Sequence, residues 1–395
     1  MKEIKVLHLF GDYLKPSEVW AYNLLKFLPN LEVHVAALHY LKNNFYDPTF
    51  HFTTNELDAL IQYKNALDRR KPIEAFHKLI IKSLPYFLGS YDNKLIRYAH
   101  EQHIDVLHAH FGPTAWKYKK IAEKLNIPFV VSFYGYDYEH YPKLNPEYNA
   151  YYRRLFQLAT MFFCEGKHGK TILIKKGCPE DKISISRLGI DIAEITFRKR
   201  DKQVAELNLI QVASFTEKKG HLYTLRAFLS ALYKCPNMKL TLIGGVKDEN
   251  IKKEVDDFIR ENNLESKVRV LHFLPYDQVI EQLYQHQVFI HPSCYTQDLD
   301  CEGGAPIVLL DAQASGMPII STRHCDIPAE VIHGETGYLV GERDVDGLEK
   351  AIIYFYNMNA DTLGEYSVKA RAHVVKEYDI RTNAARLAEI YRSLI

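Results

Sequence analysis

Three features that would narrow the function are missing from this sequence. No stretch reaches about 18 uninterrupted apolar residues, so we expect no transmembrane helix. The charges balance, at 50 Lys plus Arg against 49 Asp plus Glu, and give no reason to expect a nucleic-acid partner. The apolar run at 4–10 is too short for the core of a signal peptide. We therefore expect a cytoplasmic protein.

The cysteines also show no organised pattern. They have no C-x-x-C pair and no paired spacing, which is typical of reduced cytosolic thiols rather than of a disulfide framework or a zinc site. We interpret most of them as core residues. The six are Cys164, Cys178, Cys235, Cys294, Cys301 and Cys325.

The length and the spacing of the apolar runs indicate two domains. A chain of 395 residues, 47% hydrophobic and 25% charged, is ordinary globular material but too long for one core. Short apolar runs alternate with amphipathic stretches, as in parallel sheets with crossover helices. We expect strands at 4–10, 32–38, 104–110, 128–133, 160–164 and 183–187. A second series is expected at 207–213, 239–243, 268–272, 287–291, 318–320 and 338–340.

The stretches between these runs are expected to be helical, and Ser17 is a candidate cap for the first helix. Predicted helices are 17–28, 114–125, 147–158, 219–233, 249–262, 276–285, 306–315, 345–357 and 381–395. A charged stretch at 198–202 separates the two series. The prediction is an α/β protein with two doubly wound, Rossmann-like domains facing a cleft. The domains are 1–200 and 205–375, and a C-terminal helix within 376–395 packs back across the boundary.

Residues 61–98 do not fit the alternation of strands and helices. Between Lys64 and Lys82 basic residues outnumber acidic ones, and apolar residues recur at roughly helical spacing. One interpretation is a solvated helical insertion packed on the first domain. The other is a basic amphipathic surface that meets anionic lipid or a lipid-linked acceptor. The sequence leaves both open.

The loop that begins at Glu302 has the features of a ligand-binding loop. Gly303 and Gly304 let backbone N–H groups approach a ligand closely. Pro306 suits a first helical position, and the start of a helix favours a diphosphate. Glu302 and Asp311 can accept hydrogen bonds from sugar and ribose hydroxyls. The alternative is a glycine-rich loop that only caps a structural helix, which the flanking acids make less favoured.

These residues resemble the Glu-x7-Glu signature of glycosyltransferase family 4, in the branch that makes bacterial surface polysaccharides of the colanic-acid type. The resemblance runs over most of the chain and is specific for the family but weak for the substrate. Other segments similar to the family are PSE at 16–18, DVLHAHFG at 105–112, VVSFYGYD at 130–137, LGID at 188–191, VASFTEKKG at 212–220 and STRHCDIP at 321–328.

The resemblance implies the two-domain GT-B fold and a retaining glycosyltransferase. The first domain would bind the acceptor, a glycan or a lipid-linked sugar, and the second a UDP- or GDP-linked sugar. Such an enzyme would extend a surface polysaccharide or lipopolysaccharide, with peripheral contact at the inner face of the cytoplasmic membrane. No nucleic acid is implied.

Three departures from the family pattern concern the donor site. Glu302 and Asp311 are nine positions apart, one more than in the signature, and the second acid is the shorter Asp. Ser214 stands where the family usually has Arg, and a hydroxyl cannot bind phosphate bidentately. Lys219 would then neutralise most of the charge on the leaving phosphate. Tyr134 stands where the family usually has His.

The loop and the resemblance together give a set of candidate site residues. Catalytic candidates are Glu302, His110, Lys219 and Asp137. Donor-binding candidates are Gly11, Ser214, Lys218, Lys219, Gly303, Gly304, Ala305, Pro306, Ile307 and Asp311. Acceptor candidates are Glu18, Tyr134 and Tyr136. No cofactor and no metal are expected, because positive groups already serve the phosphate.

Other polar residues have a less specific interpretation. Asp298-x-Asp300 resembles a metal-binding D-x-D, but we interpret it as a solvated loop. His108 and His110 share one face of a strand; a zinc pair is conceivable, yet no third ligand with matching spacing is evident. His8 and His291 lie inside apolar runs and are interpreted as satisfied core histidines.

Two other functions remain open at this point. One is a weak or inactive paralogue that binds nucleotide-sugar as a partner subunit, which the departures at Ser214, Tyr134 and Asp311 would explain. The other is a nucleotide-sugar epimerase on the same two-domain plan, which would release an altered sugar nucleotide without any acceptor.

Overall fold

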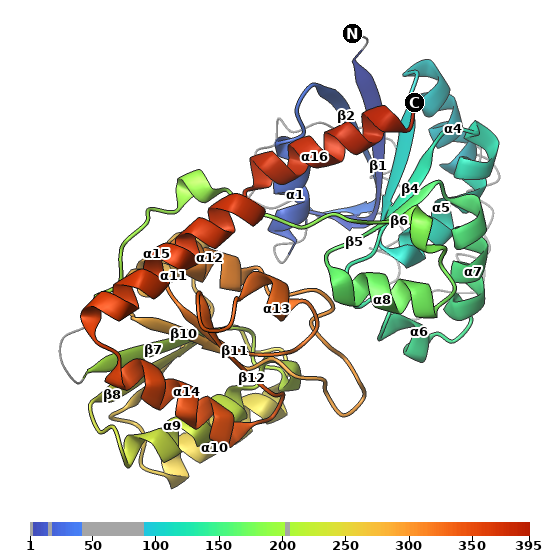
Figure 1. Cartoon of the computed structure of the whole chain (residues 1–395). Helices are drawn as coiled ribbons and strands as arrows, with labels where there is room; N and C mark the ends of the chain where they lie inside the picture. The colour runs from blue at the N-terminus through green and yellow to red at the C-terminus, as the bar shows by residue number, and fades with distance from the viewer. Residues whose placement is uncertain (1–2, 15–17, 42–90, 202–205) are drawn as a thin grey trace. The chain divides into compact units, whose positions relative to one another are not determined.

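The computed structural model describes residues 3–14, 18–41, 91–201 and 206–395 (Figure 1). They form two compact units, each with its own parallel sheet. Unit 1 contains the described residues of Met1–Cys164, Lys170–Ser186 and Arg381–Ile395, and unit 2 contains those of Glu165–Gly169 and Arg187–Ile380. The basic stretch at 64–82 and the cap candidate Ser17 lie outside the described residues.

The sheet of unit 1 has six parallel strands in the order β2-β1-β3-β4-β5-β6. Every strand predicted for the first half of the chain is present. The strands are β1 (Ile4–Tyr13), β2 (Leu31–Tyr40), β3 (Val106–His110), β4 (Phe129–Ser132), β5 (Met161–Cys164) and β6 (Ile183–Ile185). The helices are α1 (Val19–Lys26), α4 (Tyr91–Glu101), α5 (Gly112–Leu125), α6 (Tyr141–Leu144), α7 (Tyr148–Leu158), α8 (Lys167–Lys175) and α16 (Ile380–Ser393).

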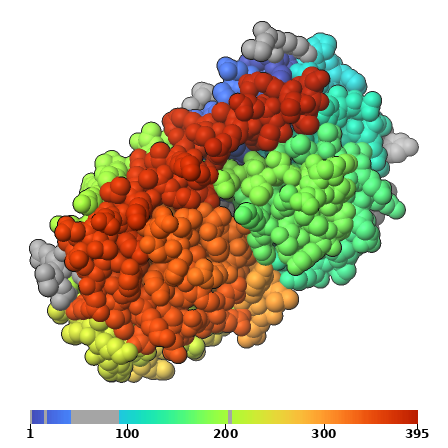
Figure 2. Space-filling model, viewed as in Figure 1, coloured from blue at the N-terminus to red at the C-terminus, as the bar shows by residue number. Residues whose placement is uncertain are grey.

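Alternation along β3 gives this sheet two chemically different faces. Leu107 and Ala109 belong to the hydrophobic core that includes residues of α5 and α7, so His108 and His110 point to the opposite face. On that face Tyr391 of α16 is fully buried, and its hydroxyl lies 2.5 Å from Nδ1 of His108. Figure 2 shows α16, in red, lying beside the blue N-terminal part of the same unit.

The sheet of unit 2 also has six parallel strands, in the order β12-β11-β10-β7-β8-β9. All six were predicted, which confirms an α/β protein with two doubly wound sheets. They are β7 (Leu207–Val212), β8 (Met238–Ile243), β9 (Val268–Leu271), β10 (Val288–His291), β11 (Ile319–Thr322) and β12 (Gly337–Val340). The helices are α9 (His221–Leu232), α10 (Glu249–Glu261), α11 (Tyr276–Tyr284), α12 (Val308–Ala314), α13 (Ile327–Glu330), α14 (Val345–Asn357) and α15 (Ala360–Glu377).

Three helices of unit 2 differ from the prediction, and one of them is the short α13, which was not predicted. α12 begins at Val308, so Pro306 precedes the helix and is not its first residue. The prediction named no helix at 360–377, where α15 begins after Asn359, whose side chain accepts a hydrogen bond from the amide of Thr362 at 2.8 Å. Among the described residues, no helix has the length and apolar character needed to cross a bilayer.

Candidate functional site

A lysine and a glutamate that are far apart in sequence meet at the carboxyl ends of the central strands of unit 2. Lys219 ends a 3₁₀ turn that follows β7, and Glu302 lies in the loop between β10 and α12. Nζ of Lys219 is 2.7 Å from Oε2 of Glu302. The hydroxyl of Ser293 donates to Oε1 of Glu302 at 2.8 Å. The side chain of Glu302 is only 6% exposed, so both of its oxygens are held in a buried position.

Glu302 is kept in its charged form. Burial alone would raise its pKa, but the Lys219 ammonium, with His291 and Lys218, holds that pKa well below its usual value. Nε2 of His291 is 3.6 Å from Oε1 of Glu302, which is longer than a hydrogen bond. Neither ring nitrogen of His291 has a hydrogen-bond partner in the described part of the chain. The interpretation of His291 as a satisfied core histidine is therefore wrong.

Lys218 points to a different part of the same loop. Its Nζ donates to the carbonyl of Cys301 at 2.8 Å and lies 3.0 Å from Oδ2 of Asp300. Asp298 accepts a short hydrogen bond from the hydroxyl of Thr296. Asp300 is thus paired with Lys218, and Asp298 is hydrogen-bonded within its own loop. The half-buried Ser214 follows β7, on the way to the lysine turn.

The two glycines of the loop are favoured for different reasons. Gly303 has a φ of 83°, a conformation that side chains rarely adopt. A Cβ on Gly304 would lie 1.6 Å from Oε2 of Glu165, so the end of that flexible side chain would have to move. The carbonyl of Gly304 accepts a hydrogen bond from the amide of Asp326 at 3.1 Å. The loop is therefore bordered by the segment around Glu165 and by the segment that follows β11.

Asp311, the second acid of the signature, lies in α12 and is 6% exposed. The hydroxyl of Tyr276 donates to its Oδ1 at 2.9 Å. Burial raises the pKa of Asp311 to about 7, and the Tyr276 hydrogen bond opposes this only in part. The carboxyl group is thus already engaged by a phenol and is close to half-protonated near neutral pH.

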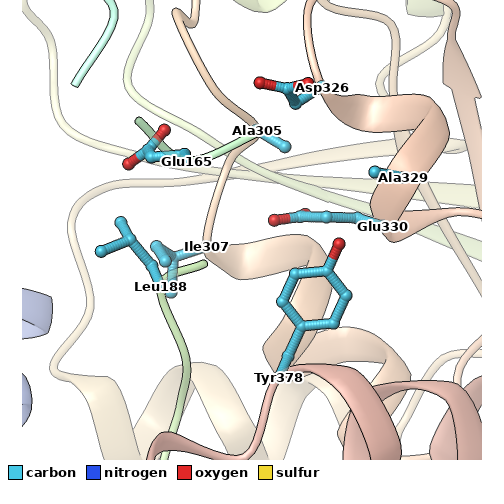
Figure 3. A pocket seen from close by; sticks show the side chains of 8 residues that line it. All are labelled: Glu165, Leu188, Ala305, Ile307, Asp326, Ala329, Glu330 and Tyr378. Carbon is cyan, nitrogen blue, oxygen red and sulfur yellow. The ribbon is translucent and has the colours of Figure 1, made fainter. Parts of the chain in front are cut away.

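A small pocket behind the loop is lined by three acids. The pocket is lined by Glu165, Asp326 and Glu330 together with Ala305 and Ile307, and Figure 3 shows the carboxyl group of Glu330 pointing toward the side of Ile307. The hydroxyl of Tyr378 points toward Glu330 in the same view. Oδ2 of Asp326 and Oε2 of Glu330 have no hydrogen-bond partner within the described residues. Burial, with the nearby charges of Glu165 and Asp326, raises the pKa of Glu330 well above its usual value.

In unit 1, His110 lies at the end of β3 and is fully buried. Its Nδ1 is 2.6 Å from the hydroxyl of Tyr134, and its Nε2 is 3.0 Å from Nδ1 of His8. His108 also uses both ring nitrogens, at 2.5 Å from the Tyr391 hydroxyl and 2.7 Å from that of Ser132. His110 can therefore influence a ligand only through Tyr134.

In the structure His8 joins His108 and His110 as a third possible metal ligand, which the spacing in the sequence did not reveal. His8, His108 and His110 each bring one ring nitrogen within 4.8 Å of the others. Every ring nitrogen of the three has a hydrogen-bond partner except Nε2 of His8, which has none among the described residues. The interpretation of His8 as a satisfied core histidine is therefore wrong as well.

Asp137 is 1% exposed and is used by the backbone. Its two carboxylate oxygens accept hydrogen bonds from the amides of Gly112 at 2.8 Å and Tyr134 at 2.9 Å. Burial raises its pKa to about 7 despite these hydrogen bonds. In this arrangement Asp137 fixes the start of α5 and the loop that carries Tyr134.

The remaining candidates of unit 1 lie near the ends of its strands and helices. Tyr134 packs on Trp20 with ring centroids 4.3 Å apart, whereas Tyr136 is 44% exposed and stacks near His140. Glu18 precedes α1 without capping it through its side chain. Gly11 lies in β1, where a Cβ would meet the Thr114 hydroxyl at 3.4 Å.

Several residues around the loop were not singled out from the sequence. Ser293 could have been found, because it lies just past a predicted strand end, where ligands of such sheets bind. Glu165, Tyr276 and Glu342 carry no local signal and reach the loop only through the folding of distant segments. His324 lies in the segment 321–328 that resembles the family, but it was not named as a site residue. Nε2 of His324 lies 3.2 Å from the amide nitrogen of Glu302, and its Nδ1 lies 2.7 Å from Glu342.

Comparisons with known proteins identify the family of the chain. The family described as Glycosyltransferase Family 4 matches residues 17–194, and Glycosyl transferases group 1 matches residues 193–373. A glycosyltransferase of Salmonella typhimurium named for colanic acid biosynthesis is 29% identical, over 73% of this chain and 71% of its own length. The amylovoran biosynthesis glycosyltransferase of Erwinia amylovora is 28% identical, over 73% of this chain and 70% of its own.

Solved structures show the same fold. A glycosyltransferase from Rickettsia africae has a TM-score of 0.72 at 15% identity, covering 100% of this chain and 99% of its own. Anabaena HepE in complex with UDP and glucose has a TM-score of 0.67 at 16% identity, covering 99% of this chain and 100% of its own. The two family matches adjoin and together span residues 17–373, and the resemblance noted in the sequence is confirmed. The chain belongs to glycosyltransferase family 4 and is a glycosyltransferase with the GT-B fold.

Proposed function

We propose that this enzyme is a retaining glycosyltransferase of bacterial surface polysaccharide synthesis. It transfers a sugar from a UDP- or GDP-linked donor to a glycan or lipid-linked acceptor. The observation that carries the proposal is the buried contact between Lys219 and Glu302 beside the two loop glycines. Support comes from the relatives named for colanic acid and amylovoran biosynthesis, and from the neighbour that holds UDP and glucose.

The donor diphosphate lies, in this proposal, against Lys219, Ser214 and the backbone N–H groups of Gly303 and Gly304. Lys219 already neutralises Glu302, so donor binding brings a second anion to the same ammonium. Lys218 is occupied by Asp300 and a backbone carbonyl and contributes positive potential rather than direct contact. Glu302 accepts hydrogen bonds from hydroxyls of the donor sugar.

The chemical step breaks the bond between the anomeric carbon and a phosphate oxygen. Positive charge then develops on the sugar ring and negative charge on the leaving diphosphate, which Lys219 stabilises. The carboxylates of Glu302 and Asp137 are already held by Lys219 and by backbone amides, so neither serves as a covalent nucleophile. We propose that the acceptor hydroxyl attacks the same face of the sugar and passes its proton to the leaving phosphate. No metal ion is required in this scheme.

The acceptor binds to unit 1. Tyr136 offers an exposed aromatic ring on which a sugar can stack, and the Tyr134 hydroxyl is fixed by His110. Glu18 precedes α1 and is the last residue of the segment PSE, which resembles the loop and helix start that faces the donor in the family. His110 and Asp137 position Tyr134 rather than contact the acceptor.

Peripheral membrane contact rests on sequence alone. The basic, apolar-interleaved stretch at 64–82 has the composition of a segment that meets anionic lipid. Its removal should lower the fraction of the enzyme recovered with anionic vesicles; an unchanged fraction would return the stretch to a role in packing or solubility.

The test is donor turnover with purified enzyme. UDP-glucose, UDP-galactose and GDP-mannose are each supplied with a polyprenyl-diphosphate-linked sugar, and nucleoside diphosphate release and the anomeric configuration of the product are measured by NMR. We expect turnover with one donor, retention of configuration and no loss with EDTA. Lys219→Ala should lower turnover by roughly 10²–10³.

The matched control is Lys234→Ala, because Lys234 pairs with Glu349 on the surface of the same unit and should leave turnover unchanged. Donor binding without turnover across the panel would point instead to a nucleotide-sugar-binding partner subunit. Release of an altered sugar nucleotide without acceptor would point to an epimerase. Inversion of configuration would contradict the proposed same-face attack.

A further inference from the structure

Cys325 lies in a cluster of groups that the proposed transfer reaction does not use. Its Sγ is 3.2 Å from Nε2 of His324, and Nδ1 of His324 is 2.7 Å from Oε1 of Glu342. Oε2 of Glu342 accepts a hydrogen bond from the amide of Tyr295 at 2.9 Å. The Glu342 carboxylate therefore contacts the His324 imidazole, and the imidazole contacts the Cys325 thiol. This is the order of groups that activates nucleophilic thiols.

The backbone holds the thiol in an unusual position. Cys325 has a φ of 45°, in the left-handed region that residues other than Gly, Asn and Asp rarely adopt. It is partly exposed, whereas the other five cysteines are buried, and none of the six forms a disulfide. Such strain is retained where the surrounding structure fixes it, and it is concentrated at functional sites.

The charges in the cluster favour the ionised thiol. Burial alone would lower the pKa of His324, but its hydrogen bonds to Cys325 and Glu342 outweigh burial and raise that pKa to about 9. Hydrogen bonding from Cys301 is the largest cause that lowers the pKa of Cys325, to about 4; His168 and His324 add to it, and burial opposes it. Among the described residues of unit 2, the titratable groups that act on the sulfur include Cys301, His168, His324 and Asp326.

We propose that Cys325 is a reactive thiolate, a modification site for soft electrophiles beside the loop that carries Glu302. In an alkylation, the thiolate sulfur forms a bond to the electrophilic carbon, the bond to the leaving halide breaks, and halide is released. His324 donates no proton in this step. The product is a neutral thioether, so the imidazolium loses its anionic partner.

Modification of Cys325 is coupled to the loop through one nitrogen. Nε2 of His324 is 3.2 Å from both Sγ of Cys325 and the amide nitrogen of Glu302. As an imidazolium, His324 donates from Nε2 to the thiolate and cannot accept from the amide. As the neutral form with its proton on Nδ1, it accepts the Glu302 N–H. Alkylation removes the thiolate and favours the second state; its effect on donor affinity rests on the proposed function, whereas the reactivity of the thiol does not.

The test is the pH profile of alkylation by iodoacetamide at each cysteine, followed by mass spectrometry of the native enzyme. The intrinsic nucleophilicity of a thiolate falls with its pKa, so the shape of the profile is more diagnostic than the absolute rate. Between pH 5.5 and 7.5 we expect the rate at Cys325 to change by less than about twofold. The same cysteine in urea-unfolded protein should react about 100-fold faster at the higher pH, as for a thiol of ordinary pKa.

Glu342→Gln removes the carboxylate that keeps His324 protonated. The contribution of His324 to the ionised thiol is then lost, and the rate at Cys325 should rise with pH more steeply than in wild type. Glu335→Gln is the control, because Glu335 is exposed and takes no part in the cluster. A native rate at Cys325 that rises about tenfold for each pH unit, or an unreactive Cys325, would overturn the proposal. If Glu342→Gln does not fold, the wild-type profile alone decides. Cys294 is the internal reference, since burial raises its pKa to about 11.

The loop coupling is tested separately by titrating UDP-glucose, UDP-galactose and GDP-mannose into enzyme alkylated only at Cys325. A change in affinity of threefold or more for the bound donor supports the coupling; an unchanged affinity contradicts it. Failure of any donor to bind even unmodified enzyme would count against the proposed function and leave the reactivity result standing.

Discussion

Nζ of Lys219 and Oε2 of Glu302 are 2.7 Å apart although 83 positions separate the two residues in sequence. The contact joins the glycine loop to the turn after β7, and it keeps Glu302 ionised. Because the pKa of Glu302 is held well below its usual value, the pair stays ionised above the pH at which an unfolded glutamate titrates. Its stabilising contribution is present above about pH 4.3 and is lost only as the pH falls through the lower folded pKa.

Glu302→Gln should therefore lower sugar transfer at neutral pH by about 100-fold or more while the fold persists. The amide keeps the shape of the side chain but leaves the Lys219 ammonium without its buried counter-charge. Initial rates and circular dichroism of the same samples measure the two effects. Glu335→Gln, at an exposed site of the same unit, is the control; transfer within twofold of wild type in Glu302→Gln would refute the assignment of Glu302.

Tyr276→Phe removes the hydroxyl that donates to Asp311. This hydrogen bond lowers the pKa of Asp311 against the effect of burial, so its loss should raise that pKa further. We expect a cost of about 1 kcal/mol in the free energy of unfolding at pH 8 and a smaller cost at pH 5, where the carboxyl group is protonated in wild type as well. Urea titrations at both pH values measure this difference, and an equal cost at the two would contradict it.

Glu330→Gln should stabilise unit 2 at alkaline pH. The folded pKa of Glu330 is raised, so the unfolded chain loses this proton first, and stability falls as the pH rises from about 4.3 toward the folded pKa. The amide removes this penalty without changing the side-chain volume. Urea unfolding of wild type and variant at pH 5 and pH 8 should show a gain confined to the higher pH. A loss of stability at pH 8 would mean that the carboxylate is compensated there.

Tyr391→Phe should destabilise unit 1 although it changes only α16. It leaves Nδ1 of the fully buried His108 without the hydroxyl 2.5 Å away, and a buried unsatisfied group costs about 1–3 kcal/mol. The free energy of unfolding of the full chain is the measurement. Tyr233→Phe is the control, because Tyr233 is 83% exposed and its hydroxyl should contribute little; equal effects of the two would argue against the histidine contact.

The strands of both units could be predicted because each is a short apolar run between amphipathic stretches, and that signal is local. The loop at 302–304 could be predicted for the same reason: its glycines and flanking acids are neighbours in sequence. The residues of other segments that face this loop could not be placed beside it from the sequence. His291 and Glu165 reach it only after the sheet and its crossovers have formed, and nothing adjacent to them in sequence marks that destination. His324 lies in the segment 321–328 that resembles the family, but that resemblance did not place it beside Glu302.

The helix boundaries show where local signals mislead. Pro306 is well suited to begin a helix, yet α12 begins at Val308, and the carbonyl of Pro306 accepts a hydrogen bond from the amide of Leu309 just before the regular helix. Likewise, His8 and His291 are buried, as their apolar neighbours suggest. Of their ring nitrogens only Nδ1 of His8 has a hydrogen-bond partner among the described residues, His110 of another strand. Position relative to strand ends carries information that hydrophobic periodicity does not.

Because α16 belongs to unit 1, that unit can finish folding only late in synthesis. Unit 1 contains both Ile4–Tyr13 and Arg381–Ile395, so its histidine face cannot be covered until nearly all of unit 2 has been synthesised. Domains generally fold as they emerge during translation, the N-terminal one first. Here unit 1 is the first unit to emerge and the last to be completed. Until Tyr391 has been synthesised, His108 and His110 of β3 are not covered by α16.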